Sequence, residues 1–135
     1  MEAQLNPYLT FNGTAAPAMK FYQSVFGGEL TMQTFGEVKM AQGPADENLI
    51  MHASLKSDSA VIMASDSQAG EPAKAGDNIR LSLSGKDEKG LTDVFNKLAE
   101  GGTVDLPMAK QFWGDTFGMV TDKFGTQWMV NIAKE

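Results

Sequence analysis

The segments FYQSVFGG, residues 21–28, and FNKLAEGG, residues 95–102, share one pattern, and this pattern decides the fold. Each places a phenylalanine six residues ahead of a Gly-Gly pair, which is typical of a helix that ends where glycine adopts positive φ. A strand pattern follows each pair. The repetition indicates a weak internal repeat, in which one structural unit occurs twice, although two short segments can also match by chance.

The first segment lies within a predicted βαβββ order. Upstream of it, Leu5, Leu9 and Phe11 alternate with polar positions, as in a half-buried strand. We predict a helix over residues 14–26 and strands over residues 5–12, 29–35, 49–55 and 60–65. The following residues, 66–77, are poor in bulky apolar side chains, which is typical of a linker.

The second segment lies within a matching order. Leu91, Val94, Phe95 and Leu98 fall on one helical stripe. We predict a helix over residues 86–100 and strands over residues 78–84, 103–107, 115–121 and 126–132. The fold class is therefore α+β, with two βαβββ modules. We expect a single domain over residues 1–135, with module one at about 1–66, a linker at 67–77 and module two at about 78–135.

Composition excludes several classes of function. The chain has no cysteine, so disulfides, thiolate metal sites and cysteine nucleophiles are ruled out. Its net charge of −6 and its scattered basic residues argue against nucleic acid and anionic membranes as partners. The apolar runs are far shorter than the roughly 20 residues of a membrane span. The N-terminal sequence MEAQLNP lacks the features of a secretory signal, so we expect a cytoplasmic protein.

Several motifs resemble one known family. They are YLTFNG at residues 8–13, FY at 21–22 with FGGE at 26–29, FWG at 112–114 with FG at 117–118, DKFG at 122–125 and WMVN at 128–131. Together they resemble the PhnB-like branch of the glyoxalase/bleomycin resistance/dioxygenase superfamily, also called the vicinal oxygen chelate superfamily. The resemblance implies that the two modules form a cupped mixed sheet around a small-molecule ligand, and that the protein is a homodimer. Members of this branch are often labelled demethylubiquinone methyltransferase-like, but the chain lacks a glycine-rich strand-turn-helix for a methyl donor.

Metal-dependent relatives in this superfamily take one ligand each from the first and last strands of the two modules. By strand position, these places fall near Asn6, Met63, Asn78 and Met129. Two amides and two thioethers lack the carboxylate and imidazole donors that hard or borderline cations prefer. We therefore predict no metal at these places and no cofactor. A divalent metal at a displaced site, formed by His52 and nearby carboxylates, is the alternative.

His52 is the single histidine and the candidate catalytic residue. Ile50, His52 and Ser54 occupy one side of its predicted strand, and the other side carries Met51, Ala53 and Leu55. The imidazole can therefore face the cup. There it would act as a general base or as a hydrogen-bonding group for a ligand. The alternative is a structural histidine that is hydrogen-bonded within the fold.

Four further residues are candidates for ligand binding. Tyr8 and Thr10 share the polar side of the first strand and would line the cup, or else form ordinary cross-strand contacts. Arg80 would hold an anionic group through its planar guanidinium, or else form an ion pair. Trp113 would form a lid or wall of the pocket, or else lie in a dimer seam or at the edge of the core. Trp128, in contrast, alternates with apolar positions and is predicted to be buried.

Three functions follow from these observations. The first is a small-molecule binding protein or a metal-independent enzyme, with the ligand held in the cup. The second is a metal-dependent lyase, isomerase or dioxygenase with displaced ligands. The third is a non-catalytic protein that sequesters a drug-like molecule. The sequence leaves open whether the protein is an enzyme and which ligand it binds.

Overall fold

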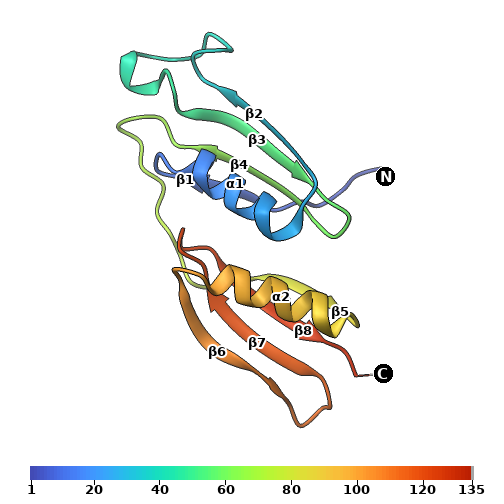
Figure 1. The fold of residues 1–135 in the computed structure, drawn as a ribbon. Helices are drawn as coiled ribbons and strands as arrows, with labels where there is room; N and C mark the ends of the chain where they lie inside the picture. The colour runs from blue at the N-terminus through green and yellow to red at the C-terminus, as the bar shows by residue number, and fades with distance from the viewer. Residues whose placement is uncertain (135) are drawn as a thin grey trace. The chain divides into compact units, whose positions relative to one another are not determined.

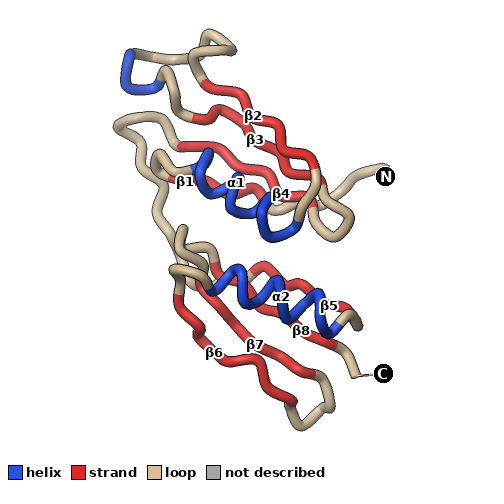
Figure 2. The backbone as a smooth tube through the Cα atoms, viewed as in Figure 1, coloured by secondary structure: helices blue, strands red, loops and turns tan. Residues whose placement is uncertain are grey.

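The computed structural model describes residues 1–134, and the chain divides into two compact units, Met1–Lys74 and Ala75–Glu135. Over residues 1–134, each unit contains one α-helix and one four-stranded mixed sheet, so the α+β class and the βαβββ order of both modules are confirmed. The unit boundary falls inside the predicted linker. Figure 1 and Figure 2 show a single helix lying against the sheet of each unit.

The first unit has the strand order β1-β4-β3-β2, in which β1 and β4 are parallel and the other neighbours antiparallel. Its elements are β1 (Tyr8–Phe11), α1 (Ala15–Phe26), β2 (Glu29–Thr34), the short 3-10 helix η1 (Pro44–Asp46), β3 (Ile50–Lys56) and β4 (Val61–Asp66).

The second unit repeats this topology with the order β5-β8-β7-β6, and β5 and β8 are its parallel pair. Its elements are β5 (Leu81–Gly85), α2 (Glu88–Ala99), β6 (Thr103–Lys110), β7 (Thr116–Thr121) and β8 (Gln127–Ile132).

The core of each unit lies between its helix and one face of its sheet. In the first unit, Ala53, Leu55, Ile62 and Ala64 are buried under α1, and they alternate along β3 and β4 with half-buried residues of the opposite face. In the second unit, Trp128 is buried, as predicted, beside Val130 and Ile132 of the same strand. One face of each sheet therefore belongs to the core of its unit.

Two predicted strands begin later than the alternation indicated. The strand predicted over residues 5–12 starts at Tyr8, and Leu5 is 99% exposed. Pro7 precedes it, and proline has no N–H to donate to a sheet. The strand predicted over residues 78–84 starts at Leu81, opposite Trp128 near the beginning of β8, and Ile79 is 74% exposed. β4 extends two residues beyond the partner of Tyr8, so Pro7 accounts for the first boundary, whereas β8 begins only one residue before the partner of Leu81.

Asp66 is the last residue of β4 rather than the first residue of a linker. Its buried carboxylate accepts hydrogen bonds from the backbone N–H groups of Gly13 (3.0 Å), Ala15 (2.9 Å) and Ile50 (2.9 Å). Thr14, which precedes the first residue of α1, makes no capping bond through its side chain. A residue far along the chain thus supplies the acceptor that the start of α1 needs.

The segment after β4 is fastened to the first unit. The carboxylate of Asp46 accepts from the backbone N–H of Ala69 at 2.9 Å, and this bond lowers the pKa of Asp46. The side chain of Asn12 donates to the carbonyl of Ala73 at 3.0 Å and accepts from the N–H of the same residue at 2.8 Å. The predicted linker therefore begins as an anchored loop.

Candidate ligand-binding site on the first sheet

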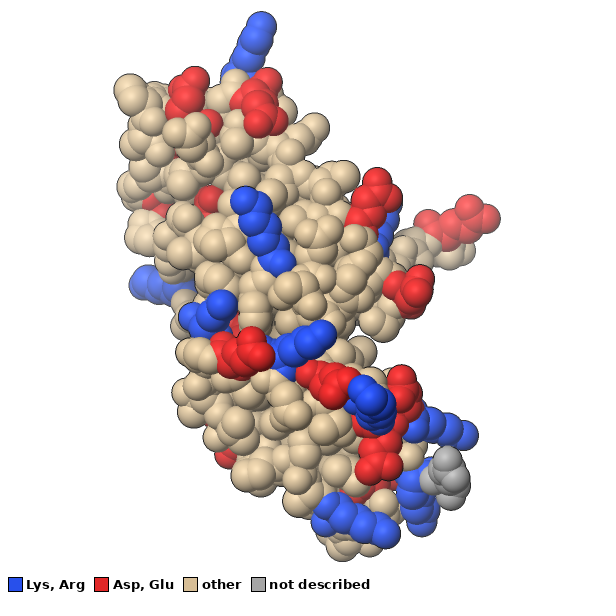
Figure 3. Space-filling model, in the orientation of Figure 1, with Lys and Arg blue, Asp and Glu red and all other residues tan. Residues whose placement is uncertain are grey.

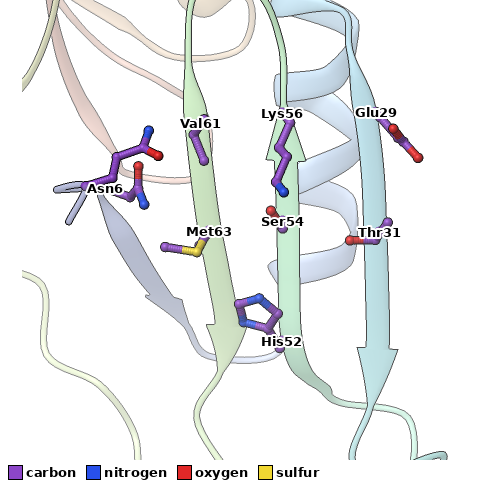
Figure 4. A pocket seen from close by; sticks show the side chains of 9 residues that line it. Asn6, Glu29, Thr31, His52, Ser54, Lys56, Val61 and Met63 are labelled. Atoms are coloured by element: carbon purple, nitrogen blue, oxygen red, sulfur yellow. The ribbon is translucent and has the colours of Figure 1, made fainter. Parts of the chain in front are cut away.

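The face of the first sheet opposite α1 forms a pocket of about 590 Å³. Figure 4 shows side chains from β2, β3 and β4 standing on this face, with Asn6 approaching from the segment before β1. The lining residues are Gln4, Asn6, Glu29, Thr31, His52, Ser54, Lys56, Val61 and Met63. The pocket belongs entirely to the first unit.

Strand register explains why these side chains meet. Ser54 lies opposite Thr31 of β2 on one side and opposite Met63 of β4 on the other, and Met63 also lies opposite Tyr8 of β1. Directly paired residues project to the same face of a sheet. One row across all four strands therefore places two hydroxyls, a thioether and a phenol on the pocket side.

Tyr8 and His52 form the central polar contact of this face. The Tyr8 hydroxyl lies 3.0 Å from His52 Nδ1, and the two ring centroids are 5.6 Å apart with an interplanar angle of 30°. Tyr8 comes from β1 and His52 from β3, with β4 between them, so the two side chains reach across a strand. Tyr8 is 48% exposed and His52 is half-buried. The pair is thus open to a ligand as well as ordered by its own hydrogen bond.

The other ring nitrogen of His52, Nε2, has no hydrogen-bonding partner among residues 1–134. Because His52 lines the pocket, a ligand there can bond to Nε2 while Tyr8 holds Nδ1. Figure 4 places the imidazole on the same face as Ser54 and Met63. The His52 imidazole is thus an oriented polar group in a pocket whose lining also includes the apolar side chains of Val61 and Met63.

Of the remaining candidates, only Thr10 belongs to this unit. It follows Tyr8 on the same face of β1, pairs in register with Ser65 and is exposed. It is outside the set of residues that line the pocket.

Arg80 and Trp113 lie in the second unit. The Arg80 guanidinium is 3.3 Å from the Asp105 carboxylate and donates to the carbonyl of Trp128 at 3.1 Å. Trp113 lies between β6 and β7, is 43% exposed and makes edge-on contacts with Phe112 and Phe117, with centroids 5.0 Å and 6.1 Å apart. The structure therefore brings Tyr8 and His52 together in the first unit, and Arg80 and Trp113 belong to the second unit.

Thr31, Ser54 and Lys56 also line the pocket, although they were not predicted as binding residues. Their signal was present in the alternation along β3, because residues 52, 54 and 56 must share one face of the strand. Thr31 and Glu29 required knowledge that β2 pairs with β3 in this register.

The donors at the four positions where metal-dependent relatives carry ligands do not fit a divalent cation. Asn6 and Met63 both line the pocket, whereas Met129 belongs to β8 and Asn78 precedes β5. An amide and a thioether are poor partners for the hard cations that prefer carboxylates. Over residues 1–134, moreover, no three side chains of the types His, Asp or Glu gather closely enough to hold an ion. No step of the function proposed below is routed through a metal.

The surface charges are mixed. On the face drawn in Figure 3, lysine and arginine side chains stand singly or beside acidic ones instead of forming one broad basic patch. No helix within residues 1–134 is long and apolar enough to cross a membrane.

Comparison with known proteins first shows which solved structures share the fold. A glyoxalase/bleomycin resistance protein/dioxygenase family enzyme from Burkholderia phytofirmans shares the fold, with 15% identity, a TM-score of 0.60 and coverage of 94% of this chain and 97% of that one. Protein PA1353 from Pseudomonas aeruginosa is more similar, with 39% identity, a TM-score of 0.87 and coverage of 99% of this chain and 100% of that one. A PhnB protein from Bacillus cereus, described as a putative 3-demethylubiquinone-9 3-methyltransferase, has 26% identity, a TM-score of 0.79 and coverage of 97% of this chain and 100% of that one.

The family is shown directly. The model of the family described as 3-demethylubiquinone-9 3-methyltransferase matches residues 3–131. The chain therefore belongs to this PhnB-like family, as its motifs predicted, and it shares the fold of the glyoxalase/bleomycin resistance protein/dioxygenase family enzyme. Membership establishes the ancestry and the fold; it does not by itself establish a reaction.

Proposed function

We propose that this protein binds a small organic molecule in the pocket of the first sheet, with Tyr8 and His52 as its polar anchor. The observation that carries the proposal is the pairing of these two residues beside a pocket of about 590 Å³, with His52 Nε2 left for a ligand. Pockets for small molecules commonly measure roughly 300–1,000 Å³ and combine apolar walls with a few placed polar groups. This pocket has both features.

The rest of the lining supports a molecule of mixed polarity. Val61 and Met63 offer apolar contact on β4, and a thioether adapts its shape to what it touches. Thr31 and Ser54 stand opposite each other and offer two hydroxyls that both donate and accept. Such a surface holds an organic ligand without a metal ion.

Binding is tested by amide NMR of the full chain with three single-ring probes of similar size, namely acetophenone, benzoate and benzylamine. We expect at least one probe to shift the amide signals of Thr31, Ser54 and Met63. His52→Ala should weaken that binding by about fivefold, since one hydrogen bond to a ligand contributes on the order of 1 kcal/mol. Asn96→Ala, at an exposed position of α2, is the matched control.

If none of the probes moves these signals, the pocket is not a binding site for organic molecules of this size. Equal affinity of the wild-type protein and the His52→Ala variant would remove His52 from the anchor. Stoichiometric metal in protein purified without chelators, lost on His52→Ala, would contradict a metal-independent site.

Two further experiments distinguish an enzyme from a protein that only sequesters its ligand. Native mass spectrometry of the freshly purified chain identifies any molecule that it carries, and incubation of that molecule with catalytic amounts of protein shows whether it is consumed. Release of the molecule unchanged favours sequestration. Turnover that is lost on His52→Ala assigns the imidazole a role in proton transfer.

The proposal includes a homodimer as the assembled form. Phe112 is 97% exposed and packs edge-on against Trp113, so the turn between β6 and β7 presents two large aromatic side chains to its surroundings. Light scattering coupled to size exclusion should give twice the mass of one chain. A single-chain mass at micromolar concentration would contradict it.

A further inference from the structure

We infer that Tyr8 fixes the tautomer of His52 so that Nε2 carries the proton, and that the ligand therefore presents an acceptor oxygen, as in a carbonyl or carboxylate group. The inference rests on the proposed function of the pocket and narrows it to a class of ligand. It starts from the 3.0 Å contact between the Tyr8 hydroxyl and His52 Nδ1.

Two directions are open to this hydrogen bond, and chemistry favours one of them. A phenol is a much stronger acid than a neutral imidazole N–H, and an imidazole nitrogen is a much stronger base than a phenolic oxygen. The better match therefore has the Tyr8 hydroxyl donating and Nδ1 accepting. A neutral imidazole carries one N–H, so the proton must then reside on Nε2.

Within residues 1–134, no group accepts a hydrogen bond from Nε2. Glu29 is the only carboxylate among the lining residues, and it lies opposite Lys56. Along β2 and β3 the pairs run Glu29 with Lys56, Thr31 with Ser54 and Gln33 with His52, so the charged pair is two steps away from the imidazole. Nε2 has no partner within residues 1–134.

The other polar groups around the pocket are also rich in donors. The Lys56 ammonium donates only, and the side-chain amides of Gln4 and Asn6 each carry two N–H groups. A ligand that offers oxygens can satisfy several of these groups at once, whereas a ligand amine would face Nε2–H and Lys56 as competing donors. His52 then acts as a donor to the ligand oxygen, and Tyr8 is a positioning residue.

The single histidine makes the tautomer measurable. A long-range ¹⁵N NMR spectrum of the labelled full chain in alkaline buffer contains one imidazole, and protonated and unprotonated ring nitrogens resonate far apart. We expect Nδ1 to be unprotonated and Nε2 protonated. In Tyr8→Phe, which keeps the ring but removes the hydroxyl, Nδ1 should gain a detectable share of the proton.

A protonated Nδ1 in the wild-type protein would overturn the inference, as would a tautomer that is unchanged in Tyr8→Phe. Acetophenone and benzoate should move the Nε2 signal, and benzylamine should not. Tyr8→Phe should bind acetophenone about threefold to tenfold more weakly, in keeping with one hydrogen bond. If only benzylamine binds, the ligand class is wrong. If no probe shifts any pocket amide, the proposed function itself fails, whatever the tautomer.

Discussion

Replacing Asp66 with alanine should destabilise the first unit more than any change of charge at its surface. The carboxylate is 4% exposed and accepts from three backbone N–H groups, at 3.0, 2.9 and 2.9 Å. These donors belong to the turn before α1, to the first residue of α1 and to the first residue of β3. One side chain thus connects the end of β4 to three other segments.

The magnitude follows from the number of donors left without an acceptor. Each buried N–H that loses its partner costs about 1 kcal/mol or somewhat more, so three of them give about 3–5 kcal/mol. Domains have total stabilities of roughly 5–15 kcal/mol, so the loss is a large part of the whole. At about 4 °C per kcal/mol, the melting temperature should fall on the order of 12–20 °C.

Urea denaturation followed by circular dichroism measures the loss. Asp58→Ala is the matched control, because this exposed residue in the turn between β3 and β4 carries the same charge. Trp113 and Trp128 both belong to the second unit, so tryptophan fluorescence reports on that unit alone. A stability of Asp66→Ala within about 1 kcal/mol of the control would refute the role given to these three bonds.

Two further predictions concern backbone geometry and pH. The Cβ of Gly27→Ala meets open space at a φ of 72°, so this change should lower the free energy of unfolding by about 1 kcal/mol. Gly28 has a φ of 96°, and its added Cβ would also lie 2.3 Å from the carbonyl oxygen of Lys56, so Gly28→Ala should cost at least about 2 kcal/mol more. Equal losses of stability in urea denaturation would contradict this difference. The side-chain amide of Asn131 lowers the pKa of Asp115 from its ordinary 3.8, so this carboxylate stabilises the fold above that pH and its contribution is lost as the pH falls through the lowered value. In Asn131→Ala the pKa of Asp115 should rise and acid should remove less stability, which ¹³C NMR of the carboxyl carbon and denaturation at several pH values would check.

The sequence predicted the helices well because their signals are local. The apolar stripe of α2 and the Gly-Gly pairs lie within the segments that they shape. The first strand of each unit was less well predicted. Leu5 and Ile79 continue the alternation of apolar residues, but both lie outside their strands. Pro7 accounts for the first boundary, and β8 begins only one residue before the partner of Leu81. The cap that Asp66 gives to α1 was also invisible, since it depends on β4 lying beside β1.

The candidate site was predicted in part. Alternation placed His52 and Tyr8 on the polar sides of their own strands, and the sequence named both. It could not show that the two side chains meet, because that requires the order β1-β4-β3 and the register of three strands. Arg80 was predicted as a candidate for ligand binding, but in the structure its guanidinium forms an ion pair. Its strand position was consistent with anion binding, yet Asp105, which pairs with it, comes from β6.

The order of strands also governs when each half of the protein can be completed during translation. β4 and β8 come last in their units along the chain but lie inside their sheets, each between two neighbours. Because β4 lies between β1 and β3, the sheet of the first unit cannot be completed until the residues up to 66 have left the ribosome. Because domains generally fold as units and N-terminal first during synthesis, we expect the first unit to close its sheet before the similar strands of the second unit are available for exchange.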